Sequence, residues 1–126
     1  MSKGKFLITD KVHQKLIDGL LGLDFAVDYK PNISQPEISI AISEYVGIVI
    51  ATSIKLKSDE LKNANSLKWI LRAGSGMENV DVEFAVRKGI TCINSPEGNR
   101  DAVGEHTLGL LISLFHNIPA SFSDIQ

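Results

Sequence analysis

The sequence contains one cysteine, no long apolar run and no marked excess of either charge. The single Cys92 excludes an internal disulfide framework and is typical of a protein in a reducing compartment. No stretch approaches the length of a membrane-spanning helix, and the apolar run Phe6–Ile8 is too short for the core of a signal peptide. The net charge of −2 gives no indication of a nucleic-acid or membrane-surface partner. We therefore expect a soluble cytoplasmic protein that binds neither.

The rest of the composition is that of an ordinary globular domain. Apolar residues make up 44% of the 126 residues and charged residues 22%, and this length is enough for one hydrophobic core. Because Cys92 lies within the apolar run Ile90–Ile93, we expect it to be a small buried residue rather than a reactive thiol.

Short apolar segments alternate with longer amphipathic ones, a pattern typical of a parallel sheet covered by helices. Five strands are expected, at Lys5–Thr9, Phe25–Tyr29, Val46–Ile50, Leu67–Leu71 and Ile90–Ile93. Helices are expected over Val12–Leu21, Ser34–Ser43, Lys57–Ala64 and Val82–Lys88, followed by a longer one from Asn99 to His116. The predicted fold class is α/β: a flavodoxin-like open parallel sheet of five strands with helices on both faces, plus a long C-terminal crossover helix.

Local signals place the ends and faces of these helices. Asp10, Ser58 and Asp81 are the expected N-caps of three helices, because their side chains can accept a hydrogen bond from a free backbone N–H. In the first helix Leu16, Leu20 and Leu21 are expected on the buried face.

The last predicted helix is apolar on nearly all sides over Val103–Phe115. Such a helix is typically packed against other elements on more than one face, and a five-stranded sheet can cover only one face. We therefore expect a second domain or subunit, and a homodimer formed through Val103–Phe115 together with a domain that this sequence does not contain.

Ligands of open parallel sheets gather beyond the carboxyl ends of the strands. The richest such end is Ala73–Gly76, where two glycines flank Ser75. Glycine lets the backbone approach a ligand closely, and successive free N–H groups can form a concavity that binds a carboxylate or phosphate. The alternative is a tight strand-to-helix turn in which glycine only supplies an unusual backbone conformation.

Two segments together resemble the NAD-dependent D-2-hydroxyacid dehydrogenases, particularly the D-3-phosphoglycerate dehydrogenase branch. Arg72–Asp81 is similar to the family's Arg-Ala-Gly-x-Gly-x-Asp-Asn-x-Asp, with Glu78 where Asp is usual. Asn94–Asn99, followed by Ala102–His106, is similar to the Asn-x-Pro-x-x-Asn crossover between the two domains and to the helix after it.

This resemblance implies an oxidoreductase that transfers a hydride between C2 of a 2-hydroxy acid and NAD. Residues 1–95 would form the substrate domain, and residues 96–126 the interdomain crossover and the first helix of an NAD-binding Rossmann domain. No Gly-x-Gly-x-x-Gly is present in the sequence, and the family's catalytic Arg and His–Glu pair have no counterpart. We therefore expect no catalytic residue and no metal site in this chain, and no turnover by the chain alone.

The resemblance also assigns contacts to individual residues. Ser75 and Gly76 would contact the substrate, a small 2-hydroxy or 2-keto acid, and Ser75 would also contact the cofactor NAD. Asn99 would line the cleft between substrate and nicotinamide, although capping the following helix is alone sufficient to explain it. Glu105 and His106 cannot form a catalytic dyad, since neighbours on a helix point in different directions.

One departure from the phosphoglycerate branch concerns charge. Where that branch has Arg-Ser, the sequence reads Ala51-Thr52, and Lys55 matches a following Lys. Lys55 or Lys57 can replace the lost guanidinium only as a point charge. The sequence therefore predicts the hydroxyacid class more firmly than phosphoglycerate itself.

Two alternatives of other classes remain. One is a stand-alone flavodoxin-like module for ligand binding or oligomerisation without catalysis. The other is a phospho-receiver domain, which needs an acidic cluster after the first strand, Asp after the third and Lys after the fifth. The sequence has Asp10, Ala51 and Asn94 at these places, which disfavours the receiver.

Overall fold

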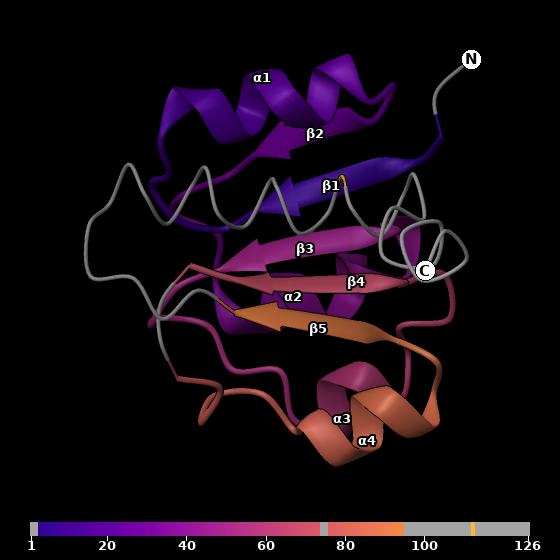
Figure 1. Ribbon diagram of the computed structural model, residues 1–126. Helices are drawn as coiled ribbons and strands as arrows, with labels where there is room; N and C mark the ends of the chain where they lie inside the picture. Colours follow the sequence, from indigo (N-terminus) through magenta and orange to yellow (C-terminus); the bar gives the residue numbers. More distant parts are fainter. Residues whose placement is uncertain (1–2, 74–75, 95–111, 113–126) are drawn as a thin grey trace, which may run out of the picture.

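The computed structural model describes residues 3–73, 76–94 and 112 of the chain. Within these residues five strands form one parallel sheet in the order β2-β1-β3-β4-β5, so that all carboxyl ends lie at one edge (Figure 1). The strands are β1 (Lys5–Ile8), β2 (Ala26–Tyr29), β3 (Gly47–Ile50), β4 (Trp69–Arg72) and β5 (Thr91–Asn94). This confirms the predicted flavodoxin-like sheet, with each strand within two residues of its expected bounds.

Helices cover both faces of the sheet, as predicted. They are α1 (Gln14–Gly22), α2 (Gln35–Ala41) with a 3-10 turn η1 (Ile42–Glu44), α3 (Ser58–Leu61) and α4 (Val82–Arg87). Leu16 and Leu20 of α1 pack on one face, whereas Ile38 of α2, Leu61 of α3 and Ala85 of α4 pack on the other. Figure 1 shows α1 beside β2, and α3 and α4 beyond β5 at the other end of the strand order.

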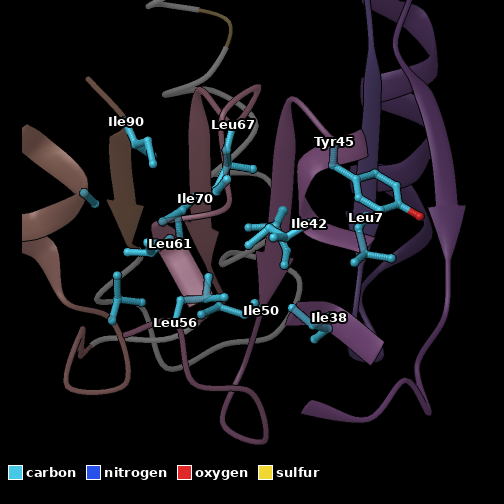
Figure 2. Packing of buried hydrophobic residues seen from close by; sticks show 14 of the residues in the cluster. Leu7, Ile38, Ile42, Tyr45, Ile50, Leu56, Leu61, Leu67, Ile70 and Ile90 are labelled. Carbon is cyan, nitrogen blue, oxygen red and sulfur yellow. The ribbon is translucent and has the colours of Figure 1, made fainter. Parts of the chain in front are cut away.

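The larger core lies under α2, α3 and α4. Alternate residues of the strands point into it, among them Leu7, Ile50 and Ile70, and all three are fully buried (Figure 2). Leu56, from the loop after β3, joins the same core and is also fully buried. Because burying such a side chain stabilises the fold by about 1.5–3 kcal/mol, this cluster also fixes the base of the loop that carries Leu56.

Three aromatic rings fill the opposite face near the amino ends of the strands. Phe6 lies edge-to-face with Phe25 at a centroid distance of 4.9 Å and is stacked with Trp69 at 6.0 Å. Gly47 stands beside Phe6 in the register of β1 and β3. A Cβ at Gly47 would lie 2.2 Å from Cε1 of Phe6, so the ring occupies the place that a side chain would take.

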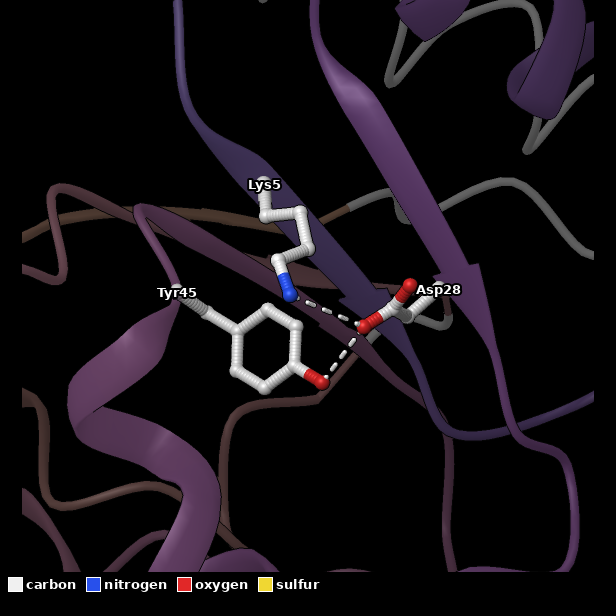
Figure 3. Close-up of polar contacts among 3 residues, drawn as sticks. All are labelled: Lys5, Asp28 and Tyr45. Carbon is white, nitrogen blue, oxygen red and sulfur yellow. Dashed lines mark hydrogen bonds and ion pairs between the residues drawn. The ribbon is translucent and has the colours of Figure 1, made fainter.

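A polar contact at the edge of the larger core joins β1 and β2 to Tyr45, which follows η1. The Tyr45 hydroxyl donates to Asp28 Oδ2 at 2.8 Å, and Lys5 Nζ lies 3.5 Å from the same oxygen (Figure 3). The Tyr45 bond, together with the Lys5 charge, holds the pKa of Asp28 below its usual value of 3.8. Burial, with the adjacent Asp28 carboxylate, raises the pKa of Tyr45 above its ordinary range.

Some helix ends agree with the sequence prediction and others correct it. Asp81 caps α4 by accepting from Phe84 N at 3.1 Å, as predicted. The prediction of Asp10 as cap of the first helix was wrong, because α1 begins after His13, whose Nδ1 accepts from Lys15 N at 3.1 Å.

Three further predictions about the helices were wrong in detail. The cap position of α3 is Lys57 rather than Ser58, since the Lys57 backbone N–H donates to Glu60 at 2.9 Å. Leu21 is 52% exposed, so the buried stripe of α1 is narrower than the three leucines suggested. α3 ends at Leu61, three residues before the predicted Ala64.

The predicted long helix lies outside the described residues except for Ile112, which is helical and half-buried. Within the described part of the chain, none of the helices has the length and apolar character needed to cross a membrane.

Candidate functional site

Two loops at the carboxyl edge of the sheet are joined to each other. The loop after β3 reaches the loop after β4 through a parallel bridge between Leu56 and Val80. Leu56 N donates to Asn79 O at 2.8 Å, and Asp81 N donates to Leu56 O at 2.9 Å. Since Leu56 and Val80 are buried in the core, the backbone on both sides of this edge is held in place.

The Asn79 side chain fastens the same two loops. Its Nδ2 donates to the carbonyl oxygens of Ala51 and Ile54, each at 2.8 Å, and its Oδ1 accepts from Arg72 Nε at 3.1 Å. Asn79 is 8% exposed, so these bonds form largely away from water, where an unpaired partner is costly. The side chain of the motif residue Asn79 therefore stabilises the two loops.

Arg72, the last residue of β4, brings a positive charge to this edge. It is only 5% exposed, and besides the bond to Asn79 its Nη1 donates to Ala73 O at 3.1 Å. Arg72 takes part in neither the Lys5–Asp28 nor the Lys62–Asp59 ion pair, and no described carboxylate pairs with its guanidinium. A buried charge without a counter-ion is expensive, and an anionic ligand would relieve that cost.

A hollow of about 460 Å³ lies over this charge. It is lined by Thr52, Lys55, Lys57, Arg72, Glu78 and Asn79. Three of these side chains are cationic and one is anionic, so the hollow is electropositive and suits a small anion.

The two lysines of the hollow are held differently. Lys57 Nζ donates to the backbone oxygen of Glu78 at 2.7 Å, which makes a further bond between the two loops. The backbone of Lys55 is fixed by the Gln35 side chain, whose Nε2 donates to Lys55 O at 2.6 Å and whose Oε1 accepts from Lys55 N at 3.0 Å. Within the described part of the chain the Lys55 ammonium has no hydrogen-bond partner, and it is exposed at the rim.

Gly76 is packed against the side chain of Glu78. A Cβ at Gly76 would lie 1.9 Å from Glu78 Oε2 and 2.8 Å from its Cδ. Glycine is therefore needed at position 76 to leave room for the carboxylate. This gives a local reason for the second glycine of the motif that is independent of any ligand.

Of the predicted site residues, the structure describes Gly76 alone. Gly76 lies in the joined loop, next to the residues of the hollow. Ser75, Asn99, Glu105 and His106 lie outside the described residues. Sequence reasoning gave no role to Asn79 beyond its match to the motif, and it placed Gln35 only at the start of a helix, not at the site. The match to the motif was the available signal for Asn79, but two of its three partners lie 25 and 28 residues away.

Other side chains with acid–base, thiol or metal-binding chemistry were also considered as candidate sites. Asp10 accepts from Lys11 N at 2.9 Å and from the Ser53 hydroxyl at 3.3 Å. Cys92 is half-buried, as a residue packed at the rim of the core, and burial raises the pKa of its thiol. In the described ranges no three His, Cys, Asp or Glu residues are grouped so as to hold a metal ion. The hollow around Arg72 is thus the site with a clear chemical preference, for an anion.

Comparison with known proteins agrees with this fold. The family described as D-isomer specific 2-hydroxyacid dehydrogenase, catalytic domain, matches residues 6–123. The D-3-phosphoglycerate dehydrogenase of Synechocystis sp. is 38% identical over 97% of this chain and 22% of its own length, and that of Archaeoglobus fulgidus is 30% identical over 97% and 23%. The solved structure of the PH0520 protein from Pyrococcus horikoshii OT3 has a TM-score of 0.70 at 27% identity, over 98% of this chain and 37% of that one.

These matches cover a much larger share of this chain than of its relatives. They cover nearly all of this chain, whereas the chain spans less than a quarter of the length of the two curated relatives. The match to the family runs over far more than half of the sequence and includes both segments that carry the resemblance. The chain therefore belongs to the family of D-isomer specific 2-hydroxyacid dehydrogenases.

Proposed function

We propose that this chain supplies the substrate-binding part of an NAD-dependent D-2-hydroxyacid dehydrogenase, which transfers a hydride between C2 of a 2-hydroxy acid and NAD. The observation that carries the proposal is Arg72, a buried guanidinium below an electropositive hollow with no described carboxylate beside it. Every substrate of this chemical class carries a carboxylate next to the reacting carbon, and a guanidinium binds a carboxylate through two parallel hydrogen bonds.

The chain's own residues would bind and orient the acid. Lys55 adds a second positive charge at the rim, and the backbone of Gly76 lies against the same loop. Ser75 and Asn99 are proposed as further substrate contacts by the family resemblance, with Ser75 also touching the cofactor. Holding the carboxylate fixes the position of C2, and orienting a reacting atom is a large part of what a protein contributes to such a transfer.

The described residues fit the acid better than the dinucleotide. NAD accepts the hydride when bound, and its pyrophosphate is usually held at the N-terminus of a helix after a glycine-rich loop. The helix that follows Gly76 is α4, and its N-terminus is already capped by the Asp81 carboxylate, with the acidic Glu83 in its first turn. Two negative charges there oppose a pyrophosphate, so we propose that the nucleotide is held mainly by a separate domain.

The proposed separation of acid binding from nucleotide binding also assigns the two parts of the chain to different domains. Residues 1–95 are proposed as the substrate domain, and residues 96–126 as the crossover and the start of the nucleotide-binding domain. The family's acid–base pair and catalytic Arg would then lie in that second domain, and we expect no NADH from the chain alone. Val103–Phe115 is proposed as the contact that builds a homodimer in the assembled enzyme.

Within the class of 2-hydroxy acids, the substrate can be proposed more specifically. The two curated relatives are named D-3-phosphoglycerate dehydrogenases, so 3-phospho-D-glycerate is one candidate. The absence of an arginine at Ala51 favours a smaller anion, for example D-glycerate, whose charge is the carboxylate alone. Among the described lysines that line the hollow, only Lys55 has an ammonium without a hydrogen-bond partner.

The proposal is tested by titrating the chain with D-glycerate and following backbone amide and arginine Nε signals by NMR. We expect shifts at Gly76 and Arg72, and about three- to tenfold weaker binding for Lys55→Gln because one nearby charge is lost. Lys68→Gln is the matched control, since Lys68 is exposed just before β4, at the amino end of the strand, and should leave the affinity unchanged. Binding that ignores both substitutions, or shifts confined to other parts of the chain, would contradict the assignment.

A further inference from the structure

Gln35, the first residue of α2, is hydrogen-bonded to the loop after β3. Its Nε2 donates to Lys55 O at 2.6 Å, and its Oε1 accepts from Lys55 N at 3.0 Å. One side-chain amide therefore binds both backbone hydrogen-bonding groups of Lys55, as a neighbouring strand would. The two residues lie 20 positions apart in the sequence, so the contact joins α2 to the rim of the hollow.

The first turn of α2 fixes the backbone that carries Gln35. The Ser34 hydroxyl accepts from Glu37 N at 3.4 Å, and Ser34 N donates to Glu37 Oε2 at 2.8 Å, which is a reciprocal cap. Pro36 follows in the first turn, where a helix accommodates proline. Ile38 of the same helix is fully buried in the larger core. Gln35 is therefore presented to the loop from a firmly placed helix end.

The backbone of Lys55 decides where its ammonium lies. Ile54 and Leu56, on either side of it, are buried in the larger core, whereas the Lys55 side chain is exposed and lines the hollow. Because the ammonium has no hydrogen-bond partner within the described part of the chain, no described side chain fixes its place directly. The bonds from Gln35 to the Lys55 backbone fix the point from which this side chain extends.

The loop is held from two sides, and the two contacts differ in their surroundings. Asn79 binds the carbonyl oxygens of Ala51 and Ile54 largely away from water. The Gln35 bonds are exposed to solvent, where a neutral hydrogen bond adds only modestly to stability. The Asn79 bonds therefore account for the stability of the loop, and the Gln35 pair is better explained by the direction that it gives to Lys55.

We infer that Gln35 is a positioning residue of the anion site, whose side-chain amide holds Lys55 so that the ammonium stays beside the hollow. The inference rests on the proposed function, since it assumes that the acid binds over Arg72. Attraction between charges falls with distance and is screened by water and salt, so an ammonium held near the ligand attracts it more than one that ranges widely. Gln35 is not among the described residues that line the hollow, and its effect passes through Lys55.

The test is a double-mutant cycle on the 126-residue chain. Dissociation constants for D-glycerate are measured by NMR titration for the wild type, Gln35→Met, Lys55→Gln and the variant with both substitutions. Met has nearly the length of Gln but cannot pair with both backbone groups of Lys55. We expect Gln35→Met to weaken binding about two- to fivefold in the wild type, and less than about 1.5-fold when Lys55→Gln is already present.

Gln14→Met is the matched control. Gln14 is the first residue of α1 and is exposed, and α1 packs on the other face of the sheet, so the affinity should not change. Amide exchange without ligand tests the contact itself: the Lys55 amide should exchange faster in Gln35→Met but not in Gln14→Met. Gln35→Asn gives a second variant, because it keeps the amide on a shorter side chain, and it too should lose affinity only while Lys55 is present.

The outcomes separate this inference from the one beneath it. An equal loss of affinity with and without Lys55, no loss in Gln35→Met, or the same loss in Gln14→Met overturns the role of Gln35 while leaving the acid site in place. Unchanged exchange of the Lys55 amide in Gln35→Met also overturns it. Absence of any shift at Gly76 or Arg72 when D-glycerate is added to the wild type overturns the acid site and the inference with it.

Discussion

Replacing Asn79 with alanine removes the side chain that fastens the two loops of the proposed site. Three hydrogen bonds are lost, to Ala51 O, Ile54 O and Arg72 Nε. A neutral bond contributes about 1 kcal/mol net, and a bond from a charged donor about 1.5–3 kcal/mol. Because Asn79 is only 8% exposed, water can replace few of these partners. We expect the free energy of unfolding to fall by about 3–5 kcal/mol.

The measurement is urea denaturation of the wild type and the variants, with the free energy obtained by linear extrapolation. Asn65→Ala serves as the matched control, because Asn65 is exposed and its side chain has no described partner, and it should change stability by less than about 0.5 kcal/mol. Asn79→Asp keeps the acceptor for Arg72 but points a carboxylate oxygen at two carbonyl oxygens. We expect it also to be destabilised, despite the gain of an ion pair.

Amide hydrogen exchange shows whether the effect is local. In Asn79→Ala the amides of Leu56 and Asp81, which join the two loops, should exchange faster by a larger factor than amides in the middle of β3. A loss of stability below about 1 kcal/mol, or an Asn79→Asp variant as stable as the wild type, would refute the reasoning that these bonds fix the site.

Three further predictions concern the core and its edge. Gly47→Ala should lower the free energy of unfolding by about 1–3 kcal/mol because its Cβ would meet the Phe6 ring, whereas Gly22→Ala, with nothing within 4 Å of the added Cβ, should be neutral or stabilising. Thermal melts compare the two variants, and equal changes in stability would contradict the clash. The pKa of Asp28 is lowered in the folded state, so the ionised carboxylate stabilises the fold above the usual pKa of 3.8, and this stabilisation is lost as the pH falls through the folded pKa. Tyr45→Phe should make the free energy of unfolding fall less in acid, and an unchanged pH profile would exclude the Tyr45 hydrogen bond as the cause of the lowered pKa. Cys92, whose pKa burial raises, should react with a thiol reagent at neutral pH far more slowly in the folded chain than in denaturant, and equal rates would show an open thiol.

Most of the fold could be predicted from the sequence because its signals are local. The β-branched run of β3 is buried at all four positions, and the capping box of α2 has the Ser-x-x-Glu spacing that the structure shows between Ser34 and Glu37. The start of the first helix could not be predicted in this way. Asp10 is the better cap by residue type, but its carboxylate already accepts from Lys11 N and Ser53 Oγ. Ser53 lies 43 residues away, and only the folded sheet brings it near.

The candidate site shows the same limit more strongly. The glycine motif drew attention to the loop beside the hollow, and Gly76 lies in that loop. The buried charge of Arg72 and the bonds of Asn79 depend on carbonyl groups at the end of β3 and beyond it, and no spacing rule connects those positions. The reason for Gly76 was also not available from sequence, since it arises from the conformation of Glu78 two residues later.

The arrangement divides the residues of one short motif between two tasks. Asn79 and Asp81 use their side chains to hold loop and helix, so substitutions there change stability and the site together. Glu78 and Lys55 face the hollow without described side-chain partners, so substitutions there change the charge offered to a ligand at little structural cost. A chain built in this way can alter how tightly it binds an acid while keeping the same folded loops. Affinity for an anion is therefore expected to respond to Lys55 and Glu78, and unfolding free energy to Asn79. A Glu78→Gln variant that lost several kcal/mol of stability would show that this division does not hold.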